Sequence, residues 1–570
     1  MNHFLKAVVI TIALLCNFVT VAQNTISKDT ISSESVVVIK SFNPTINDAF
    51  KIKQEPSLEQ DEEIEKPELN YTINSVAVPS TFTPQKTKPV ELKKDKLPKQ
   101  FDRYVLLGGG NYLNLNAEAF GKFKIDRSSE LILFLNHLSS QGGIKEVSLN
   151  DHFYDTNLKT SFEKQNRYSS WIADLELHHQ LYNWYGIPDE STFTTEQIES
   201  VNPSHSFIDA NLGGKFFLDS KVVPTLSSRF RHFRDDYGSS ENNLVVDPEF
   251  QFSFNRNKVK FPVHLDALFG SFDQTDILEQ NTYGLVNFGI KPNFILDVNG
   301  ASVQLGFSGF VSSDIENGST KFFAYPNVKA SYKIPQLNIN LFGGVTGDLV
   351  QNSYHRAAEQ NLFTAPSLTI SPTNKIFNAY GGINGSVNSN FGYEAKISLS
   401  RDNNLPLWVK LPEFTFNDEV VNYGLNNAFT YVYDNVTTGS LSAKLDYEVE
   451  NSFGLGLDAT VYTYDTKDQL EAWNLPSVKA KANANYYFMP ELNVTSYLFY
   501  TGSRKDIDQF TGDTVSLDGF FDVNIRGDYR INEQWQAFIT GNNLLANSYQ
   551  LWQDYPVQSI QVMVGAKYKF

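Results

Sequence analysis

The sequence has little cysteine, little charge and few long apolar runs. A single cysteine among 570 residues excludes a disulfide framework and any metal site built from several thiolates. Charged residues make up 19% of the chain, below the quarter that is usual in soluble domains. With a formal net charge of −17, the chain also lacks the surplus of Lys and Arg that binding of duplex nucleic acid requires.

The one long apolar run lies near the N-terminus, from Ala7 to Val21, with Lys6 before it and the small Ala22 after it. This pattern predicts an export signal peptide over residues 1–23, and a retained membrane helix is the alternative. We interpret Cys16 as part of the removed peptide. No later stretch approaches the roughly 20 apolar residues of a spanning helix. If the exported chain sits in a membrane, it must therefore do so as a closed β-barrel.

The chain is rich instead in aromatic residues and in runs where apolar and polar residues alternate. The chain has 44 Phe and 28 Tyr, and apolar residues recur at every second position in many runs of about ten residues, as strands require. We expect Leu445 and Val523 to face lipid, and Asp446 and Asn524 to face a lumen. Long strands with a polar second face match a transmembrane barrel better than a soluble sandwich.

The predicted fold class is all-β, a large antiparallel transmembrane β-barrel over residues 101–570. About 20 to 22 strands can be counted, and about 22 is favoured. An even number is required to place both chain ends on one side, and the count falls to 16 or 18 if some of these runs are loops. Residues 125–130 and 489–491 are predicted as periplasmic turns. Long outside loops are predicted at residues 186–205, 351–375 and 402–424.

Residues 24–100 differ from the rest in being rich in proline and mixed charge, as in Asp61–Glu62–Glu63. This composition predicts an extended N-terminal periplasmic arm with little structure of its own. One β-prone run stands out in the arm: Glu34, Ser35, Val36, Val37, Val38 and Ile39. Such a run can add as a strand to a partner's sheet, or it can pair in the barrel mouth or fold into the lumen.

The C-terminal segment SIQVMVGAKYKF carries the most specific pattern. One face of this segment is formed by Ile560, Val562, Val564, Ala566, Tyr568 and Phe570. A terminal Phe, an aromatic residue two positions earlier and alternating apolar residues resemble the insertion signal that the barrel-assembly machinery reads. An ordinary amphipathic strand is the alternative. The signal implies a Gram-negative outer membrane, with its lipid and the assembly machinery as partners.

Residues 541–545, GNNLL, followed by Tyr549 and the final strand, resemble the last hairpin of TonB-dependent receptors. Residues 34–39 resemble a TonB box in type and position. Residues 104–120 and 136–145 are similar to plugless barrels of this kind from Bacteroidota. The resemblance implies a receptor that moves or binds a solute, with TonB or a surface lipoprotein as partner. Only about 65 polar, Pro-rich residues separate Ile39 from Tyr104, roughly half of what a plug domain needs, so we expect no full plug.

No catalytic pattern is present: the sequence contains no G-x-S-x-G, no H-E-x-x-H and no phosphate-binding loop. Glu176 and His178 share a predicted lumen face while His179 points the other way, and two groups do not make a metal site. Gly108–Gly110 is interpreted as easing a bend or close packing, and Asp235–Asp236 as a solvated loop. The sequence therefore predicts no enzyme activity, no metal and no cofactor.

Charged residues on the predicted lumen face could line a pore and set its ion preference. The same residues could instead be self-neutralising pairs that stiffen the wall, and the sequence leaves both open. They are Lys444, Asp446, Glu448, Asp458, Lys479, Lys481, Arg526, Asp528 and Arg530.

Three functions are compatible with these patterns. The TonB-box-like run favours solute transport or binding across the outer membrane. The missing plug favours an accessory or assembly barrel of an envelope complex that uses its arm to hold a partner. The absent catalytic patterns count against a barrel-embedded enzyme.

The terminal aromatic residue offers a direct test of the insertion signal. Changing Phe570 to Asp should reduce insertion, because it places a charge at the aromatic end of the signal. Heat-modifiable migration of outer-membrane fractions on gels measures the inserted fraction. Recovery of the unaltered protein as a soluble periplasmic species would contradict the prediction.

Overall fold

The structure is a computed structural model that describes residues 101–570, except positions 190, 255–256, 274–281, 417–418 and 451. The signal peptide expected at residues 1–23 and the arm expected at residues 24–100 lie outside the described residues, as does the TonB-box-like run 34–39. These three interpretations stay predictions. Among the described residues, no helix combines the length and the hydrophobicity that crossing a bilayer demands.

Strands make up most of the described chain. The wall strands are β1 Arg103–Gly110, β2 Leu115–Lys124, β3 Ser129–Ser140, β4 Phe153–Gln165, β5 Ser169–Asn183, β6 Ser204–Leu218, β7 Thr225–Asp235, β8 Ser240–Phe254, β9 Asn257–Ser271, β10 Thr282–Ile290, β11 Asn293–Val298, β12 Ala301–Asp314, β13 Ser319–Ile334, β14 Ile339–Val350, β15 Thr373–Ser386, β16 Phe391–Lys410, β19 Phe429–Val449, β20 Phe453–Thr466, β21 Val478–Met489, β22 Leu492–Thr501, β25 Phe520–Arg530, β26 Trp535–Asn542 and β29 Gln561–Lys569. The shorter elements are η1 Asn111–Leu113, α2 Thr195–Ser200, η2 Pro335–Leu337, α3 Tyr354–Gln360, β17 Glu413–Phe416, β18 Glu419–Leu425, β23 Arg504–Ile507, β24 Thr514–Leu517, β27 Gln550–Trp552 and β28 Tyr555–Pro556.

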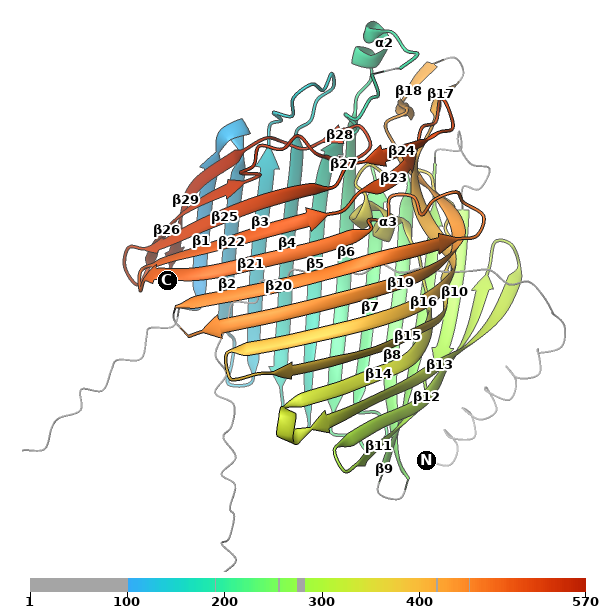
Figure 1. The fold of residues 1–570 in the computed structure, drawn as a ribbon, viewed down its shortest axis with the longest axis vertical. Helices are drawn as coiled ribbons and strands as arrows, with labels where there is room; N and C mark the ends of the chain where they lie inside the picture. The colour runs from blue at the N-terminus through green and yellow to red at the C-terminus, as the bar shows by residue number, and fades with distance from the viewer. Residues whose placement is uncertain (1–100, 190, 255–256, 274–281, 417–418, 451) are drawn as a thin grey trace, which may run out of the picture. The chain divides into compact units, whose positions relative to one another are not determined.

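The wall is one closed antiparallel sheet (Figure 1). Apart from β10 and β11, which do not pair with each other, each wall strand pairs with the wall strands before and after it, and β1 pairs with β29, so no edge is left open. Both β10 and β11 pair with β9 and with β12. Pro292, which has no N–H to donate, lies between β10 and β11 and interrupts the ladder there. The 23 strands of the sheet therefore occupy 22 positions, which confirms the predicted barrel.

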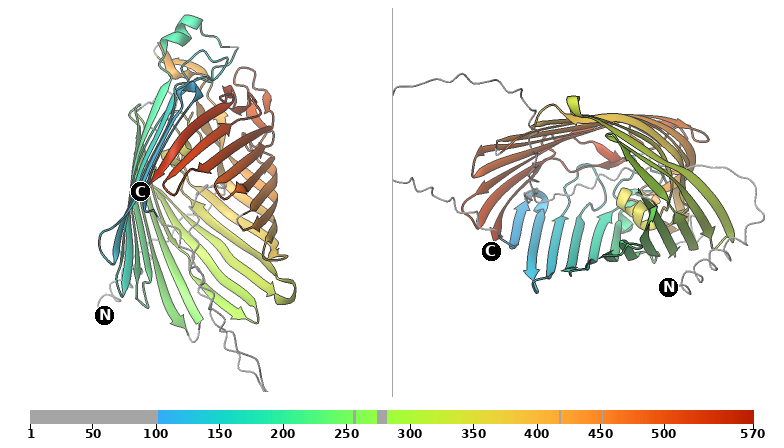
Figure 2. Two further views of the ribbon diagram at one scale, coloured as in Figure 1. Left: turned by 90° about the vertical axis from the view of Figure 1, so that its left-hand side faces the viewer. Right: turned by 90° about the horizontal axis from the view of Figure 1, so that it is seen from below.

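The two ends of the barrel differ. We call the end where β1 begins and β29 ends the terminal rim, and the opposite end the loop rim. The turns at residues 125–128 and 490–491 lie at the terminal rim with the chain ends. The long connections 184–203, 351–372 and 411–428 lie at the loop rim, where α2 and the β17–β18 hairpin project furthest (Figures 1 and 2).

One predicted outside loop is wrong in part. Residues 402–410 were expected in a loop, but β16 continues to Lys410 and keeps its pairing with β19 up to Phe429. The ladder shifts register between Asn403 and Leu405. Beyond that shift Leu405 becomes buried in a small cluster, so the strand gains burial by continuing. The connection that remains carries β17 and β18.

Side chains alternate between an outer and an inner face, as the sequence pattern predicts. Leu445 lies opposite Leu457, and Val523 lies opposite Leu498. Leu445, Leu457 and Leu498 are all exposed. Asp446 and Asn524 follow directly along the same strands, so their side chains point to the opposite face. A belt of exposed Leu, Val, Ile and Phe covers the outer face, which is the surface that a barrel presents to lipid.

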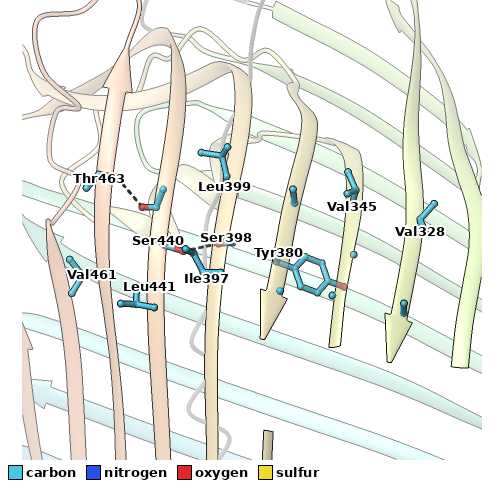
Figure 3. A pocket seen from close by; sticks show the side chains of 16 residues that line it. Val328, Val345, Tyr380, Ile397, Ser398, Leu399, Ser440, Leu441, Val461 and Thr463 are labelled. Carbon is cyan, nitrogen blue, oxygen red and sulfur yellow. Dashed lines mark hydrogen bonds between the residues drawn. The ribbon is translucent and has the colours of Figure 1, made fainter. Parts of the chain in front are cut away.

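The outer wall is hollowed where small residues meet across β13 to β20 (Figure 3). Gly343 pairs with Gly381, and Gly439 lies two strands further on. The larger Ile397 and Leu441 border this depression of about 960 Å³. Because these glycines have no side chains to fill the space between neighbouring strands, the belt of exposed apolar side chains is interrupted here.

Glycines also shape the seam where the barrel closes. Gly108 of β1 pairs with Gly565 of β29, and the ring of Phe538 lies over both. A Cβ on Gly108 would approach this ring to 2.7 Å, and one on Gly565 would approach it to 2.5 Å. The glycine run 108–110 therefore serves close packing, as its sequence suggested.

The face assignment can be tested on two neighbouring residues of β19. Arg at Leu441, on the outer face, should destabilise the barrel by about 2–4 kcal/mol, because it places a charge in lipid. Arg at Ser442, on the inner face, should be tolerated. Equilibrium unfolding from lipid vesicles measures both variants. Equal losses of stability would mean that the faces are misassigned.

Candidate functional site

Residues 351–372, which we call the occluding loop, connect β14 to β15 and turn into the barrel. The loop carries α3, which lies inside the ring of strands (Figure 2). Ser353 caps α3 by accepting from the N–H of Arg356 at 3.1 Å. Tyr354, Ala357 and Ala358 form its buried face, at the spacing that places residues on one side of a helix. A segment expected as an outside loop thus fills the lumen near the loop rim.

The occluding loop packs against opposite walls of the barrel. The ring of Phe207 of β6 lies 6.2 Å from the ring of Tyr354 on one side, and Phe429 of β19 exchanges backbone hydrogen bonds with the loop on the other. Leu268 of β9 and Trp408 of β16 are further buried wall residues. These wall residues and the apolar residues of the loop belong to a single buried cluster. The loop therefore joins walls that are far apart around the barrel, and it does so through a core like that of a soluble domain.

Backbone and amide hydrogen bonds hold the loop at its base and at its middle. The Asn352 amide donates to the Ser371 carbonyl at 2.8 Å and to Thr373 Oγ1 at 2.7 Å. In the middle of the loop, the N–H of Ala365 donates to the carbonyl of Phe429 at 2.8 Å, and the N–H of Phe429 donates to Phe363 at 2.9 Å. The two ends of the loop are thereby tied together, and its centre is joined to β19.

A buried carboxylate receives the start of α3. Glu241 of β8 is 1% exposed. It accepts hydrogen bonds from the N–H of Tyr354 at 2.6 Å, the N–H of His355 at 3.3 Å and the hydroxyl of Tyr283 at 2.7 Å. An acceptor at a helix N-terminus satisfies N–H groups that have no partner within the helix. Glu241 thus fixes the position of α3 against the wall.

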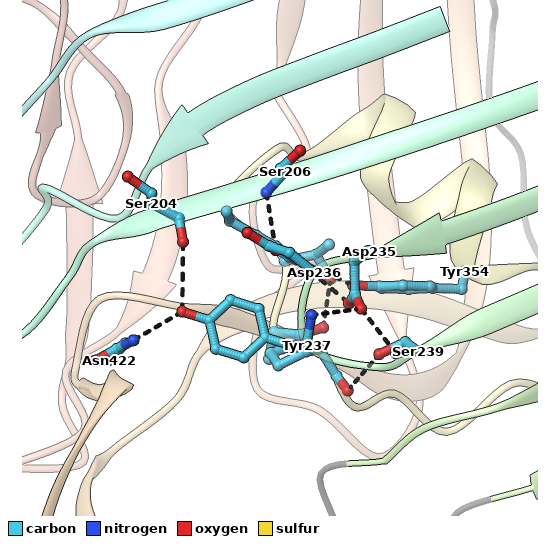
Figure 4. Close-up of polar contacts among 12 residues, drawn as sticks. Ser204, Ser206, Asp235, Asp236, Tyr237, Ser239, Tyr354 and Asn422 are labelled. Atoms are coloured by element: carbon cyan, nitrogen blue, oxygen red, sulfur yellow. Dashed lines mark hydrogen bonds and ion pairs between the residues drawn. The ribbon is translucent and has the colours of Figure 1, made fainter. Parts of the chain in front are cut away.

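A second buried carboxylate holds the side chain of the same tyrosine (Figure 4). The Tyr354 hydroxyl donates to Asp235 Oδ2 at 2.6 Å, and His205 Nε2 lies 3.3 Å from the same oxygen. Asp235 Oδ1 accepts from the N–H of Ser239 at 2.8 Å. Burial, aided by the Asp235 charge, raises the pKa of Tyr354 well above its ordinary value, so the phenol stays a donor. The solvated loop expected at Asp235 is wrong, because tertiary packing buries its side chain completely.

The lumen side of α3 is held by a mixed cluster of charged and polar groups. Asp209 of β6 lies 3.3 Å from Arg231 Nε and 3.4 Å from His355 Nε2. Arg231 Nη1 also lies 2.8 Å from His355 Nδ1, and His355 Nδ1 lies 3.6 Å from Glu359. Opposite charges and hydrogen bonds therefore anchor the helix on the face that looks toward the terminal rim.

Three further connections at the loop rim contact one another through buried polar groups. The buried ammonium of Lys410 contacts Asp554 at 2.5 Å and the Gly186 carbonyl at 3.3 Å. The Asn427 amide donates to the Trp184 carbonyl at 3.0 Å. The connections between β5 and β6, β16 and β19, and β26 and β29 are joined in this way. The result is a folded cap over one end of the lumen.

The charges that the sequence pointed to lie on the inner face of β19, β20, β21 and β25, apart from this cap. Lys444 lies 3.4 Å from Asp446 and pairs in register with Asp458, and Arg526 binds Asp528 at 2.9 Å. These contacts neutralise charge locally. The remaining members, Glu448, Lys479, Lys481 and Arg530, lie along the same strands.

The histidines singled out in the sequence enter ordinary wall contacts. His178 Nε2 lies 2.9 Å from Asp155, Glu176 binds Lys159 at 2.7 Å, and His179 faces outward to Ser206. Within the part of the chain that the structure describes, no three His, Cys, Asp or Glu side chains gather as metal ligands would.

The C-terminal segment closes the barrel. Val562 and Val564 of β29 are exposed, Ala566 and Tyr568 at alternate positions of the same strand are half-buried, and Ile560 precedes the strand. Phe570 stacks on Tyr568 at 5.7 Å, and its N–H donates to the Arg103 carbonyl at 3.0 Å.

Sequence reasoning missed the residues that hold the cap, above all Glu241, Asp235 and Tyr354. One signal was available in the loop. Tyr354, Ala357 and Ala358 stand at helical spacing, and Phe363, Leu368 and Ile370 follow. A solvated loop has no need of so many apolar residues, so their presence indicates burial.

The fold is shared with solved structures of receptors and of a transporter. The FrpB iron transporter of Neisseria meningitidis superposes with a TM-score of 0.60 at 11% identity, covering 83% of this chain and 82% of that chain. The siderophore receptor PirA of Acinetobacter baumannii gives 0.60 at 10% identity, with 84% and 81% covered. The ferric-catecholate import receptor Fiu of Escherichia coli K12 gives 0.55 at 11%, with 83% and 82% covered. No protein-family model and no curated protein sequence matches the chain. These likenesses establish the fold.

The role of Glu241 can be tested by hydrogen exchange. Glu241→Gln should speed hydrogen exchange of the backbone amides of residues 354–361 by about tenfold or more. The reason is that a side-chain NH₂ group, which cannot accept, replaces one of the carboxylate oxygens that accept buried backbone N–H groups. Glu249→Gln, on the same strand but paired with Lys260 at 2.8 Å, should leave these amides unchanged. Equal exchange in both variants would refute the anchoring role.

Proposed function

We propose that the protein moves a solute across the outer membrane, and that the occluding loop is the gate of its pathway. The observation that carries the proposal is a barrel of 22 wall positions in which a loop of the same chain packs between facing walls near one rim. A lumen enclosed by 22 strands is normally plugged, and an unfilled one would leak. The names of FrpB and PirA, an iron transporter and a siderophore receptor, support a transport role for this fold.

The packing of the loop makes spontaneous opening rare. Burying Phe363, Leu368 and Ile370 contributes about 5–9 kcal/mol, at about 1.5–3 kcal/mol for each side chain. Withdrawal of the loop would expose these side chains and break the contacts of Glu241 and Asp235. Opening therefore requires a bound solute or a source of work.

We propose TonB, or another periplasmic or lipoprotein partner, as that source, captured by residues 34–39 after export by the signal peptide. Insertion would use the barrel-assembly machinery, and the exposed apolar belt would contact outer-membrane lipid. The support is the resemblance of residues 34–39 to a TonB box and the fold shared with outer-membrane receptors. The residues of the proposed arm are too few and too polar for a full plug, so the gate is assigned to the barrel's own loop.

A second candidate is an accessory barrel of an envelope complex, without transport. The folded cap favours it, since α2 and the β17–β18 hairpin form a projecting unit in which Glu413 accepts from Ser191 Oγ at 2.6 Å. Purification from the native outer membrane distinguishes the two. A stable envelope complex supports the accessory role, and isolation of the barrel alone supports transport. Neither candidate requires enzyme activity.

Replacing residues 353–370 by a short Gly-Ser linker should turn a silent barrel into an open pore. In planar bilayers, we expect no steady conductance from the unaltered protein and large, long-lived conductance from the variant. The matched control replaces residues 195–200, a helix at the same rim but outside the lumen, and should stay silent. A silent loop variant would mean that the loop is not what blocks the lumen.

Val37→Pro tests the partner. Proline removes one backbone N–H from the run and should weaken pairing with a partner strand, while barrel insertion stays normal. Photo-crosslinking in cells from position 39, in the same run, reads out the contact with and without Val37→Pro. Crosslinks to TonB that Val37→Pro abolishes support energy coupling. Crosslinks to the barrel's own lumen would contradict it.

A further inference from the structure

Four cations gather at the terminal rim of β1 to β5, and we call them the basic sector. Arg103 begins β1, Lys164 lies near the end of β4, and Arg127 and Arg167 lie in the turns that follow β2 and β4. The three arginines are exposed and Lys164 is half-buried. The basic sector is far along the barrel from the cap, which lies at the loop rim.

The wall members of the basic sector lie on the outer face. Arg103 occupies the face of β1 that carries the exposed Leu107, and Lys164 occupies the face of β4 that carries the exposed Leu158. Both Leu107 and Leu158 belong to the apolar belt. The two cations therefore point away from the lumen, toward the surroundings of the barrel.

The cations of the basic sector have no anionic partner in the described part of the chain. None of the four forms an ion pair or a side-chain hydrogen bond there. Cations on the inner face of the same strands do, since Lys122 contacts Glu130 at 2.5 Å and Lys159 contacts Glu176 at 2.7 Å. Asp126, the acid of the first turn, accepts instead from the N–H and the hydroxyl of Ser128 at 2.6 and 2.8 Å. The sector thus presents uncompensated positive charge.

Aromatic rings hold two of the guanidinium groups in place. The Arg103 guanidinium carbon lies 4.7 Å from the centre of the Phe123 ring, and that of Arg167 lies 5.2 Å from the centre of the Tyr168 ring. A cation over a ring is attracted by the negative face of the ring. The planar fork of N–H groups remains available, and its geometry matches phosphate oxygens.

The same stretch of outer wall carries an aromatic patch at the edge of the apolar belt. Trp171 pairs in register with Lys164, and its ring lies 5.2 Å from that of Phe162 and 6.4 Å from that of Phe216. Toward the loop rim the outer face continues with the exposed Leu175. Aromatic rings of this kind mark the level of lipid headgroups. The cations of the sector therefore lie where lipid phosphates lie, next to a surface for acyl chains.

Other turns of the terminal rim carry charge of the opposite sign. Exposed Glu450, Glu491 and Glu533 lie in the turns after β19, β21 and β25. An anionic headgroup is attracted to the basic sector and repelled by these turns. The rim is therefore asymmetric, which distinguishes the sector from a uniform ring of interfacial residues.

We propose that the basic sector binds the headgroups of anionic phospholipids, with Arg103 and Arg167 on lipid phosphate and the acyl chains on the apolar belt. Five neighbouring strands about 4.8 Å apart span roughly 20 Å, so the sector takes more than one phosphate. The proposal goes beyond solute transport, because lipid binding depends neither on conduction nor on TonB.

The test is a lipid titration of the full exported chain in detergent, followed by native mass spectrometry. The probes are dioleoylphosphatidylglycerol, cardiolipin and dioleoylphosphatidylcholine, which has the chains of the first probe but no net charge. We expect the two anionic lipids to bind about tenfold more tightly than the zwitterionic one, since each Lys or Arg near the headgroups favours negative charge. Inorganic phosphate at the same concentration should not displace them, because it lacks acyl chains. Equal binding of the zwitterionic lipid, or displacement by phosphate, would overturn the proposal.

Paired variants locate the lipid. Arg103→Gln combined with Arg167→Gln should remove most of the preference for anionic lipid, while Arg103→Lys combined with Arg167→Lys keeps the charge and should retain more of it. The control is Lys145→Gln combined with Arg401→Gln, which removes the same charge from two exposed residues outside the sector and should leave the preference unchanged. Heat-modifiable migration shows that each variant is a folded barrel. An unchanged preference in the first pair, or an equal loss in the control, would refute the assignment.

Discussion

Pairing of the backbone in apolar surroundings is the constraint on which this structure depends. The outer face is a belt of exposed apolar side chains, and in lipid no water can satisfy an open strand edge. The pairing of β1 with β29 removes the last edge. Close approach at this seam is possible because Gly108 meets Gly565 beneath Phe538. Closure in turn fixes the number of wall positions, and with it the width of the lumen.

A lumen of this width would leak if it were unfilled, and the occluding loop packs across it near the loop rim. A soluble-protein core forms inside the barrel, between walls that face each other across the lumen. Apolar burial supplies most of the free energy, while Glu241 and Asp235 supply position, because each accepts hydrogen bonds from Tyr354 of the loop. Removing one of these buried acceptors leaves donors unsatisfied in a dry environment. The cap is therefore stable and specific, yet built from a segment that could be withdrawn as a unit.

The charged residues of the barrel wall and those of the cap differ in how strongly their interactions contribute to stability. Lys444 and Asp446 are both more than half exposed and lie 3.4 Å apart, so their pairing is worth at most about 1 kcal/mol. Asp235 is fully buried, where the same kind of group strongly prefers to be hydrogen-bonded. The charged residues that the sequence pattern singled out, such as Lys444 and Asp446, therefore contribute little to stability. Asp235, which the sequence pattern did not connect with the cap, holds it in place.

Alternation in the sequence was enough to predict the barrel and the opposite faces of neighbours such as Leu445 and Asp446, because period two is a local property of an extended chain. It gave the strand number only as a range, and the closed sheet fixed it at 22 positions. It could not place residues 351–372 or the extension of β16 past Asp402. Those depend on which inner-face side chains meet across the lumen once the sheet has closed, and Glu241 and Tyr354 are 113 residues apart. Contacts between distant strands leave no periodic trace, so only the tertiary structure decided what fills the barrel.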